Sequence, residues 1–152
     1  MSEHQVLELD RFLPYRLSVL SNRLSHAIAR CYETRFQLSV TEWRVIAVLG
    51  RFPGLSANEV AERTAMDKVA VSRAVAGLLE SKRLQRSLHD SDRRRSVLEL
   101  SEAGYAIFDA VVPLALTYER ALLDALEPQE RQTLIALLDK LGANAKQAES
   151  VL

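Results

Sequence analysis

Residues 55–104 constrain the fold of this chain more than any other stretch, because they combine two short helix patterns, a tight turn and a basic hairpin. The first helix begins in the capping-box sequence Ser56-Ala57-Asn58-Glu59, in which the serine and glutamate side chains satisfy free backbone amides. Asp67 is placed to cap a second helix, since its carboxylate can accept amide hydrogen bonds in the first turn. This arrangement predicts a helix-turn-helix.

The second of these helices has two distinct faces. Apolar side chains at helical spacing define the buried face: Val71, Val75, Leu78 and Leu79. Small, hydroxyl and cationic side chains share the opposite face: Lys68, Val69, Ser72, Arg73 and Ala76. Such an outward face suits the major groove of DNA, where arginine reads guanine through two parallel hydrogen bonds. We therefore expect this helix to contact DNA through Lys68, Val69, Ala70, Ser72 and Arg73.

Two alternating segments follow the second helix and predict a β-hairpin. The alternating residues are Leu84, Arg86 and Leu88, then Ser96, Leu98 and Leu100. The polar run between them carries Arg93, Arg94 and Arg95 near the predicted tip, and we expect these three arginines to contact DNA as well. A helix-turn-helix followed by a basic hairpin is a winged helix. The predicted fold class is mainly α, with a small β component.

The sequence of this region resembles that of the MarR-type transcriptional regulators. On the second helix the resemblance lies in the run Asp67-Lys68-Val69-Ala70-Val71-Ser72-Arg73. The family's wing pattern is Asp-x-Arg, five residues, Leu-Thr, two residues and Gly. Here it is matched by Asp92, Arg94, Leu100 and Gly104, with Ser101 in place of threonine. The resemblance implies a homodimeric regulator of transcription, which we interpret as a repressor of an inverted-repeat operator in double-stranded DNA. Arg94 resembles the family's wing arginine, which enters the minor groove.

Helix patterns also flank the winged helix. Before it, apolar residues recur at three- and four-residue steps, which predicts one helix over 10–36, followed by a helix capped by Thr41. After it, Ser101 should cap a long helix that contains Pro113 and runs to about Leu126. A last helix opens at Glu127, and its apolar seam consists of Leu134, Leu137, Leu138 and Leu141.

These flanking helices carry more apolar surface than a winged helix of about fifty residues can cover. A symmetric dimer, in which helices of both chains bury each other's stripes, is the simplest explanation. We therefore expect a single domain over 1–152, with a winged helix-turn-helix at 41–104. The dimerisation helices are expected at 10–36 and 105–150.

Composition and charge are compatible with this interpretation. Of 152 residues, 48% are hydrophobic and 26% charged, as in soluble globular proteins. Without an apolar run of membrane-spanning length or a signal-peptide core, a cytoplasmic location is expected, with no membrane partner. The net charge is zero, but six cations against two carboxylates give +4 between Ser81 and Ser96. DNA attraction depends on such local patches. Cys31, the single cysteine, falls on an apolar stripe, and we expect it to be a buried structural residue rather than a redox sensor.

The family resemblance further implies a small-molecule effector, since MarR-type regulators often bind aromatic carboxylates or other phenolic compounds between the dimerisation helices and the winged helix. An arginine or histidine beside an aromatic ring suits a planar anion through charge and stacking. The residues that fit such a site are Tyr15, Arg16, Arg23, His26, Arg30 and Trp43. Each is also compatible with an ordinary structural or solvated role.

The sequence contains no pattern that indicates catalysis. The three histidines, His4, His26 and His89, have no cysteine or carboxylate neighbours at metal-ligand spacing. A Gly-rich phosphate loop and a nucleophile elbow are both missing. We expect neither an enzyme nor a bound cofactor. Two alternatives remain open: a winged helix that docks on a protein partner, and an architectural DNA binder without a ligand. Lys68, Arg73 and the arginine run argue against the first.

Overall fold

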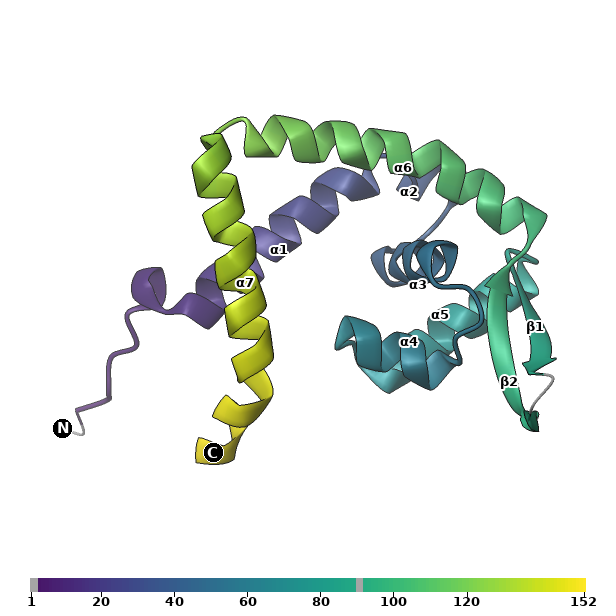
Figure 1. Ribbon diagram of the computed structural model, residues 1–152, viewed down its shortest axis with the longest axis horizontal. Coiled ribbons are helices and arrows are strands. Elements are labelled where there is room, and N and C mark those ends of the chain that lie inside the picture. The colour runs from purple at the N-terminus through teal and green to yellow at the C-terminus, as the bar shows by residue number, and fades with distance from the viewer. Residues whose placement is uncertain (1–2, 90–91) are drawn as a thin grey trace. The chain divides into compact units, whose positions relative to one another are not determined.

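A computed structural model describes residues 3–89 and 92–152 of the chain, with the backbone alone for residues 88, 89 and 92–95 (Figure 1). By internal contacts the chain divides into two compact units, Met1–Ala115 and Leu116–Leu152. The helices are η1 (Leu9–Arg11), α1 (Leu13–Ala29), α2 (Glu33–Phe36), α3 (Val40–Arg51), α4 (Ala57–Thr64), α5 (Lys68–Glu80), α6 (Glu102–Leu123), α7 (Pro128–Ala148) and η2 (Glu149–Val151). The strands β1 (Leu84–His89) and β2 (Asp92–Leu100) form one antiparallel hairpin. The predicted mainly α class with a winged helix is confirmed.

The helix-turn-helix forms as its sequence predicts. Ser56 and Glu59 make a reciprocal capping box at the start of α4. The helix ends at Ala65, whose left-handed backbone (φ 53°) turns the chain toward α5. Asp67 caps α5 by accepting a hydrogen bond from the backbone N–H of Ala70 at 2.9 Å. The turn between the two helices is therefore fixed by local hydrogen bonds on both sides.

The cap of α3 differs from its prediction. Thr41 was expected to be the N-cap, but Ser39 holds that position and Thr41 lies inside the helix. Ser39 and Glu42 form a second capping box, in which each side chain accepts the other residue's backbone N–H. Ser39 occupies the N-cap position because Glu42 lies three residues after it, which is the spacing that a capping box requires.

The hairpin packs beside α3 and α5 and is tied to the connection between α3 and α4. Leu84 pairs with Leu100 and Leu88 with Ser96, so the two alternating segments form the predicted hairpin, and the register shifts between Leu88 and His89. Leu98 exchanges two backbone hydrogen bonds with this connection: its N–H donates to Leu55 at 2.8 Å, and its carbonyl accepts from Gly54 at 2.9 Å. Gly54 has a φ of 88°, a conformation that glycine adopts without strain. The three arginines lie within strand β2 rather than in the turn at the tip.

One apolar core joins the winged helix to α1 and the first part of α6. It contains side chains that are at most 4% exposed, among them Val45, Ile46, Leu49, Val60, Val71, Val75, Leu78, Leu98, Leu100, Ile107 and Val111. The residues contributed by α5 are the predicted ones, with Ala74 in addition, whereas Leu79 is only half-buried. This core fixes the face that α5 turns outward.

The start of α6 is anchored to the base of the hairpin. The hydroxyl of Ser101 donates to the carbonyl of Lys82 at 2.7 Å and accepts from the N–H of Gly104 at 3.2 Å, so Ser101 caps α6 as predicted. A Cβ at position 104 would overlap the carbonyl oxygen of Arg83, and only glycine fits there without a shift. The glycine of the wing pattern therefore has a packing reason. Pro113 is accommodated inside α6, which continues to Leu123.

The expected single helix over 10–36 is wrong. Helix α1 ends at Ala29, and the four-residue α2 follows after a turn. Tyr32 explains the break, because it turns into the core, where it is 1% exposed and stacks on Trp43 with the ring centroids 5.4 Å apart. Gln37, with a φ of 55°, then ends α2.

Three of the flanking helices expose apolar side chains in the single chain, and on α6 these include Leu114, Leu116 and Leu122. On α1 these are Leu13, Leu17 and Leu20, at 42–50% exposure. On α7, Leu134, Leu137, Leu138 and Leu141 are 39–52% exposed, and none of the residues of this helix is buried. None of the helices in the described chain has the length and apolarity that a membrane span requires.

Candidate nucleic-acid interface

Helix α5 presents four of its five predicted contact residues on one exposed face. Lys68, Val69, Ser72 and Arg73 are all exposed, and Val69 reaches 57% although it is apolar. Ala70 is half-buried and turns toward α3. The helix is held rigidly from behind by Val71, Val75 and Leu78. A capped helix with a rigid back and an outer face of small and cationic side chains can enter a major groove and meet base edges.

The predicted wing contacts are only partly described. Arg93, Arg94 and Arg95 lie in β2 by backbone, but their side chains fall outside the described residues. Two other cations of the basic stretch have structural partners. Arg83 donates to the carbonyl of Phe36 at 2.6 Å, and Arg86 donates to the hydroxyl of Ser96 at 3.0 Å across the hairpin. Part of the local positive charge therefore also holds the hairpin in place.

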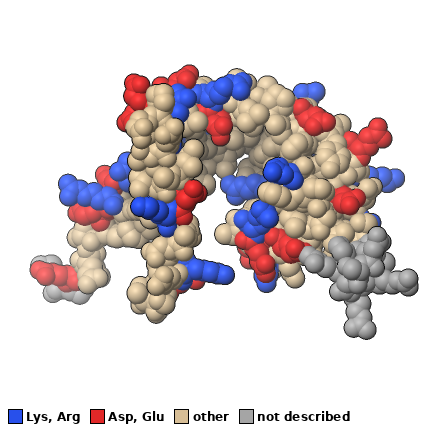
Figure 2. Space-filling model, viewed as in Figure 1, with Lys and Arg blue, Asp and Glu red and all other residues tan. Residues whose placement is uncertain are grey.

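Charges of both signs are interspersed on the face of the molecule that Figure 2 shows. On the face shown in Figure 2, Lys and Arg side chains alternate with Asp and Glu, in keeping with a net charge of zero. Attraction to DNA must then come from local cations, such as Lys68 and Arg73 on α5, rather than from the net charge of the molecule.

Sequence reasoning missed a hollow beside the exposed face of α5. It is lined by Ser39, Thr41 and Glu42 at the start of α3 and by Ala70, Arg73 and Ala74 on α5. Arg73 thus shares its surroundings with the capping box of α3. The Ser39-x-x-Glu42 spacing was visible in the sequence, but its position beside α5 depends on the packing of the two helices.

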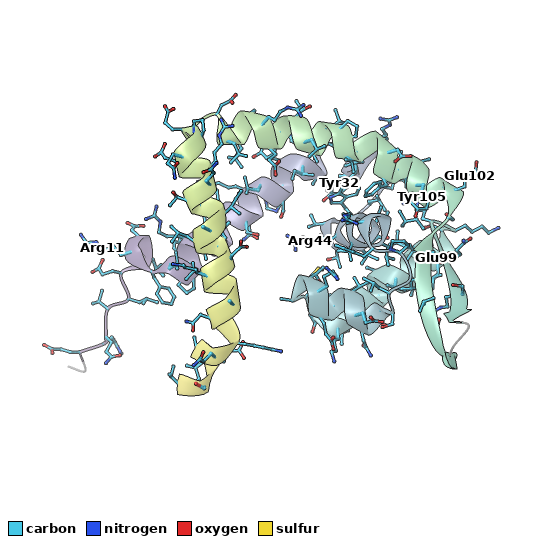
Figure 3. The ribbon with its side chains drawn as sticks, in the orientation of Figure 1. Arg11, Tyr32, Arg44, Glu99, Glu102 and Tyr105 are labelled. Atoms are coloured by element: carbon cyan, nitrogen blue, oxygen red, sulfur yellow. The ribbon has the colours of Figure 1, made fainter. Side chains whose placement is uncertain are left out.

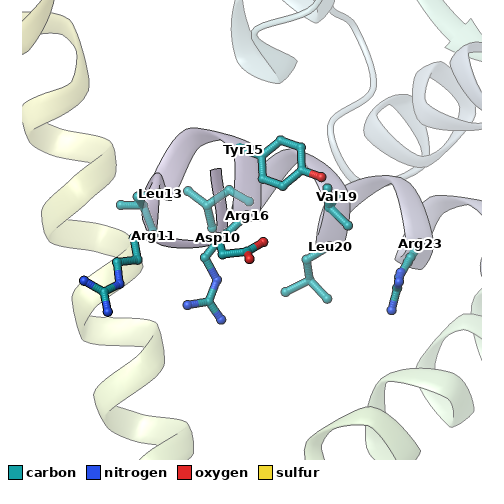
Figure 4. Close-up of a pocket in the computed structure, with 9 residues that line it drawn as sticks. Asp10, Arg11, Leu13, Tyr15, Arg16, Val19, Leu20 and Arg23 are labelled. Atoms are coloured by element: carbon teal, nitrogen blue, oxygen red, sulfur yellow. The ribbon is translucent and has the colours of Figure 1, made fainter. Parts of the chain in front are cut away.

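A second, open hollow lies along α1 and brings together three of the six predicted ligand residues. Tyr15, Arg16 and Arg23 line it together with Asp10, Arg11, Leu13, Leu17, Val19 and Leu20 (Figure 4). Leu20 and Arg23 project from the same side of α1, and Arg11 lies in η1 just before this helix. His26 and Arg30 are exposed outside this hollow. The hollow therefore combines an aliphatic wall, one phenol, several guanidinium groups and the carboxylate of Asp10.

Trp43, the sixth predicted ligand residue, lies elsewhere. It stacks on Tyr32 at the edge of the core, and Arg44 extends from the same helix α3 (Figure 3). Burial raises the pKa of the Tyr32 phenol, and Arg44 opposes that rise by favouring the phenolate. Arg44 donates to the hydroxyl of Ser25 on α1 at 2.8 Å, so it links α3 to α1. Cys31 was expected to be buried; it is half-buried and packs against the core.

Metal chemistry has no evident place at either hollow. Among the residues that the structure describes, no group of three or more His, Cys, Asp or Glu side chains lies close enough together to hold a metal ion.

The fold and the exposed face of α5 define a winged helix-turn-helix protein of the DNA-binding class. A family model described as the MarR family matches residues 36–95, from the end of α2 into β2. A crystal structure of a MarR/EmrR family transcriptional regulator from Acinetobacter sp. ADP1 has 30% sequence identity and a TM-score of 0.84, and the match covers 93% of this chain and 99% of that one. The chain belongs to the MarR family of transcriptional regulators.

Two curated relatives agree with this assignment. The HTH-type transcriptional regulator BilQ of Clostridium symbiosum is 30% identical over 97 residues, which are 64% of this chain and 67% of that protein. The HTH-type transcriptional repressor NicR of Pseudomonas putida is 29% identical over 105 residues, which are 69% of this chain and 66% of that protein. The matches thus span about two thirds of each relative. Proteins of this family are DNA-binding transcriptional regulators that act as dimers, and they are not enzymes.

Proposed function

We propose that this chain is a repressor that binds an inverted-repeat operator as a homodimer and is released by a small aromatic or anionic ligand. The observation that carries the DNA part is the exposed face of α5, where Lys68, Ser72 and Arg73 stand on a helix whose opposite face is buried. In the proposed complex α5 lies in the major groove. The wing contacts the DNA phosphates or the minor groove through Arg93, Arg94 and Arg95. A role as repressor, rather than activator, is supported by the similarity to NicR, which is a transcriptional repressor.

The dimer is proposed from the exposed leucines of α1 and α7, which a single chain leaves in water. Exposed apolar patches of this kind mark interaction surfaces. With a two-fold axis between the chains, the two copies of α5 would read two half-sites of opposite orientation. The proposed dimerisation segments are 10–36 and 105–150, within a single domain of residues 1–152.

The ligand is proposed to bind in the hollow along α1. Arg16 and Arg23 supply positive charge beside Tyr15 and an aliphatic wall, a combination that suits a planar anion with an apolar body. Release requires the ligand to favour a dimer geometry in which the recognition helices no longer match the operator. A ligand that bound both geometries equally would not shift the equilibrium.

The test of DNA recognition is selection of bound duplexes from a randomised pool by the purified protein. We expect enrichment of a two-fold symmetric sequence, and recovery of random sequences would contradict the proposal. The ligand part is tested by thermal shift with aromatic carboxylates such as benzoate. A compound that raises the unfolding midpoint should also release the selected duplex. Arg23→Gln should abolish that shift, whereas Arg30→Gln, outside the hollow, should preserve it.

A further inference from the structure

A stripe of small residues on α5 faces the first turn of α3. Ala70, Arg73, Ala74 and Gly77 occupy positions i, i+3, i+4 and i+7 and therefore lie on one side of the helix. Three of these four positions carry at most a methyl group, which lets the start of α3 come close to α5. The fourth, Arg73, is exposed at the edge of the hollow that the two helices form.

Glu42 holds a fixed carboxylate in that hollow. Its Oε1 accepts the backbone N–H of Ser39 at 3.0 Å, while the hydroxyl of Ser39 accepts the N–H of Glu42 at 3.1 Å. Its Oε2 points to α5, 3.4 Å from the place where a Cβ on Gly77 would sit. Gly77 is four residues beyond Arg73, a rise along the helix of about 6 Å. The capping box therefore anchors a negative charge against the recognition helix, close to the arginine that is proposed to read a base.

We propose that Glu42 is a specificity-determining residue, which raises the discrimination between operator and other DNA by disfavouring contact of Arg73 with phosphates. This inference rests on the proposed function, in which Arg73 contacts a base. A phosphate drawn to Arg73 meets the repulsion of the nearby carboxylate, whereas the edge of a guanine carries no formal charge. Specificity arises from repulsive elements against the wrong contact as well as from attraction to the right one.

Solvent screening leaves this repulsion effective. The Debye length is about 8 Å at physiological ionic strength, which is longer than one helical turn. A carboxylate free to rotate would move away from an incoming phosphate, but Glu42 is held by its hydrogen bond to Ser39. The carboxylate therefore stays in place when a phosphate approaches Arg73.

The chain contains a matched control for the capping role of Glu42. Ser56 and Glu59 form the same reciprocal box at the start of α4, with both hydrogen bonds at 3.2 Å. Glu59 borders a different hollow, together with Leu55, Glu62 and Arg63, which contains no residue of α5. Replacing each glutamate by glutamine removes one negative charge and keeps an oxygen that can accept the capping hydrogen bond, since glutamine also occurs at this position of capping boxes.

The experiment measures the affinity of each variant for two duplexes: the one that the wild-type protein selects from a randomised pool, and a scrambled duplex of the same composition. Glu42→Gln should bind the scrambled duplex about fivefold more tightly, as expected for the loss of one charge interaction in a solvated site. Its affinity for the selected duplex should change less than twofold. The discrimination ratio, which is the affinity for the selected duplex divided by that for the scrambled duplex, therefore falls. Glu59→Gln should keep the wild-type ratio. Thr41→Glu, which adds a carboxylate to the hollow without touching the capping box, should raise it.

The mechanism is tested by repeating Glu42→Gln in an Arg73→Ala background, where the ratio should no longer respond. An unchanged ratio in Glu42→Gln, or an equal fall with and without Arg73, would overturn the role of Glu42. If Arg73→Ala itself leaves the affinity for the selected duplex unchanged, the proposed base contact fails instead, and the two failures are distinguishable. Thermal unfolding shows whether each variant is folded. If Glu42→Gln does not fold, Thr41→Glu tests whether a carboxylate in this hollow raises the discrimination between the two duplexes.

Discussion

Gly104 and Gly77 lie in helices with very different surroundings. A Cβ at position 104 would overlap the backbone carbonyl of Arg83, whereas a Cβ at position 77 would meet the Glu42 carboxylate at 3.4 Å, an ordinary contact. Gly104→Ala should therefore lower the free energy of unfolding by about 1–3 kcal/mol, the usual cost of overpacking. Gly77→Ala should raise it by up to about 1 kcal/mol, because alanine is the better helix former.

Denaturant unfolding at one fixed protein concentration measures both changes, since the stability of a dimer depends on concentration. A destabilising Gly77→Ala would show that α3 and α5 are packed too closely for a methyl group. A neutral Gly104→Ala would mean that the base of the hairpin moves easily, and the packing reason for this glycine would be wrong.

Arg73 and Arg94 are predicted to make different kinds of contact with DNA. Arg73 stands on the exposed face of α5, where a bidentate contact with guanine is possible. Arg73→Ala should cost about 1–3 kcal/mol of binding free energy and relax the preference at one base pair of each half-site. Arg94→Ala should weaken binding to all sequences, flatten the salt dependence because fewer counterions are released, and affect only the flanking preference.

Binding isotherms at two salt concentrations, over a set of single-base operator variants, separate the two roles. Lys140→Ala, a loss of one exposed cation far along the chain on α7, is a control for net charge and should change neither preference nor salt slope. An Arg94→Ala variant with wild-type affinity and salt slope would remove the wing from the proposed interface.

At the scale of elements, the parts that the sequence predicts well are those governed by neighbours in the chain. The caps of α4 and α5 act over three residues, and the hairpin itself follows from the alternation of residue types on both sides of a polar turn. The exposed face of α5 could be predicted for a related reason, because it is the complement of an apolar stripe at helical spacing.

The parts that could not be predicted depend on contacts between elements. Nothing local ends α1 at Ala29; the break comes from the burial of Tyr32 against Trp43, eleven positions later in the sequence. The register of the hairpin shifts between Leu88, which pairs with Ser96, and His89, which pairs with Asp92, and the alternation of residue types did not predict this irregularity. Likewise, the hollow between α3 and α5 exists only once the helices pack, so Glu42 carries no visible signal of its position beside Arg73.

For the molecule as a whole, we predict a homodimer whose stability depends on the apolar seam of α7. Leu137 and Leu141 are about half exposed in the single chain, one turn apart. Changing both to Asp should give monomers in sedimentation experiments, because two charges per chain would have to be buried in the interface. The matched control is Gln132→Asp together with Lys140→Asp, two exposed polar positions on the same helix, which should stay dimeric. A wild-type protein that sediments as a monomer at micromolar concentration would rule the dimer out.

Loss of the dimer should also weaken operator binding. A dimer binds its second half-site as an intramolecular step, whereas a monomer has to bind each half-site independently. The zero net charge makes this linkage important, since no strong overall field adds affinity for DNA.

The central claim is that two copies of α5 read one two-fold symmetric operator. Footprinting of the wild-type dimer on the duplex that it selects tests this most directly. We predict two protected half-sites of inverted sequence, about 10 base pairs apart from centre to centre, as recognition helices in successive major grooves require. The double variant Leu137→Asp, Leu141→Asp should protect neither half-site at the same protein concentration. Protection of a single unsymmetrical site, or protection without sequence preference, would contradict the claim.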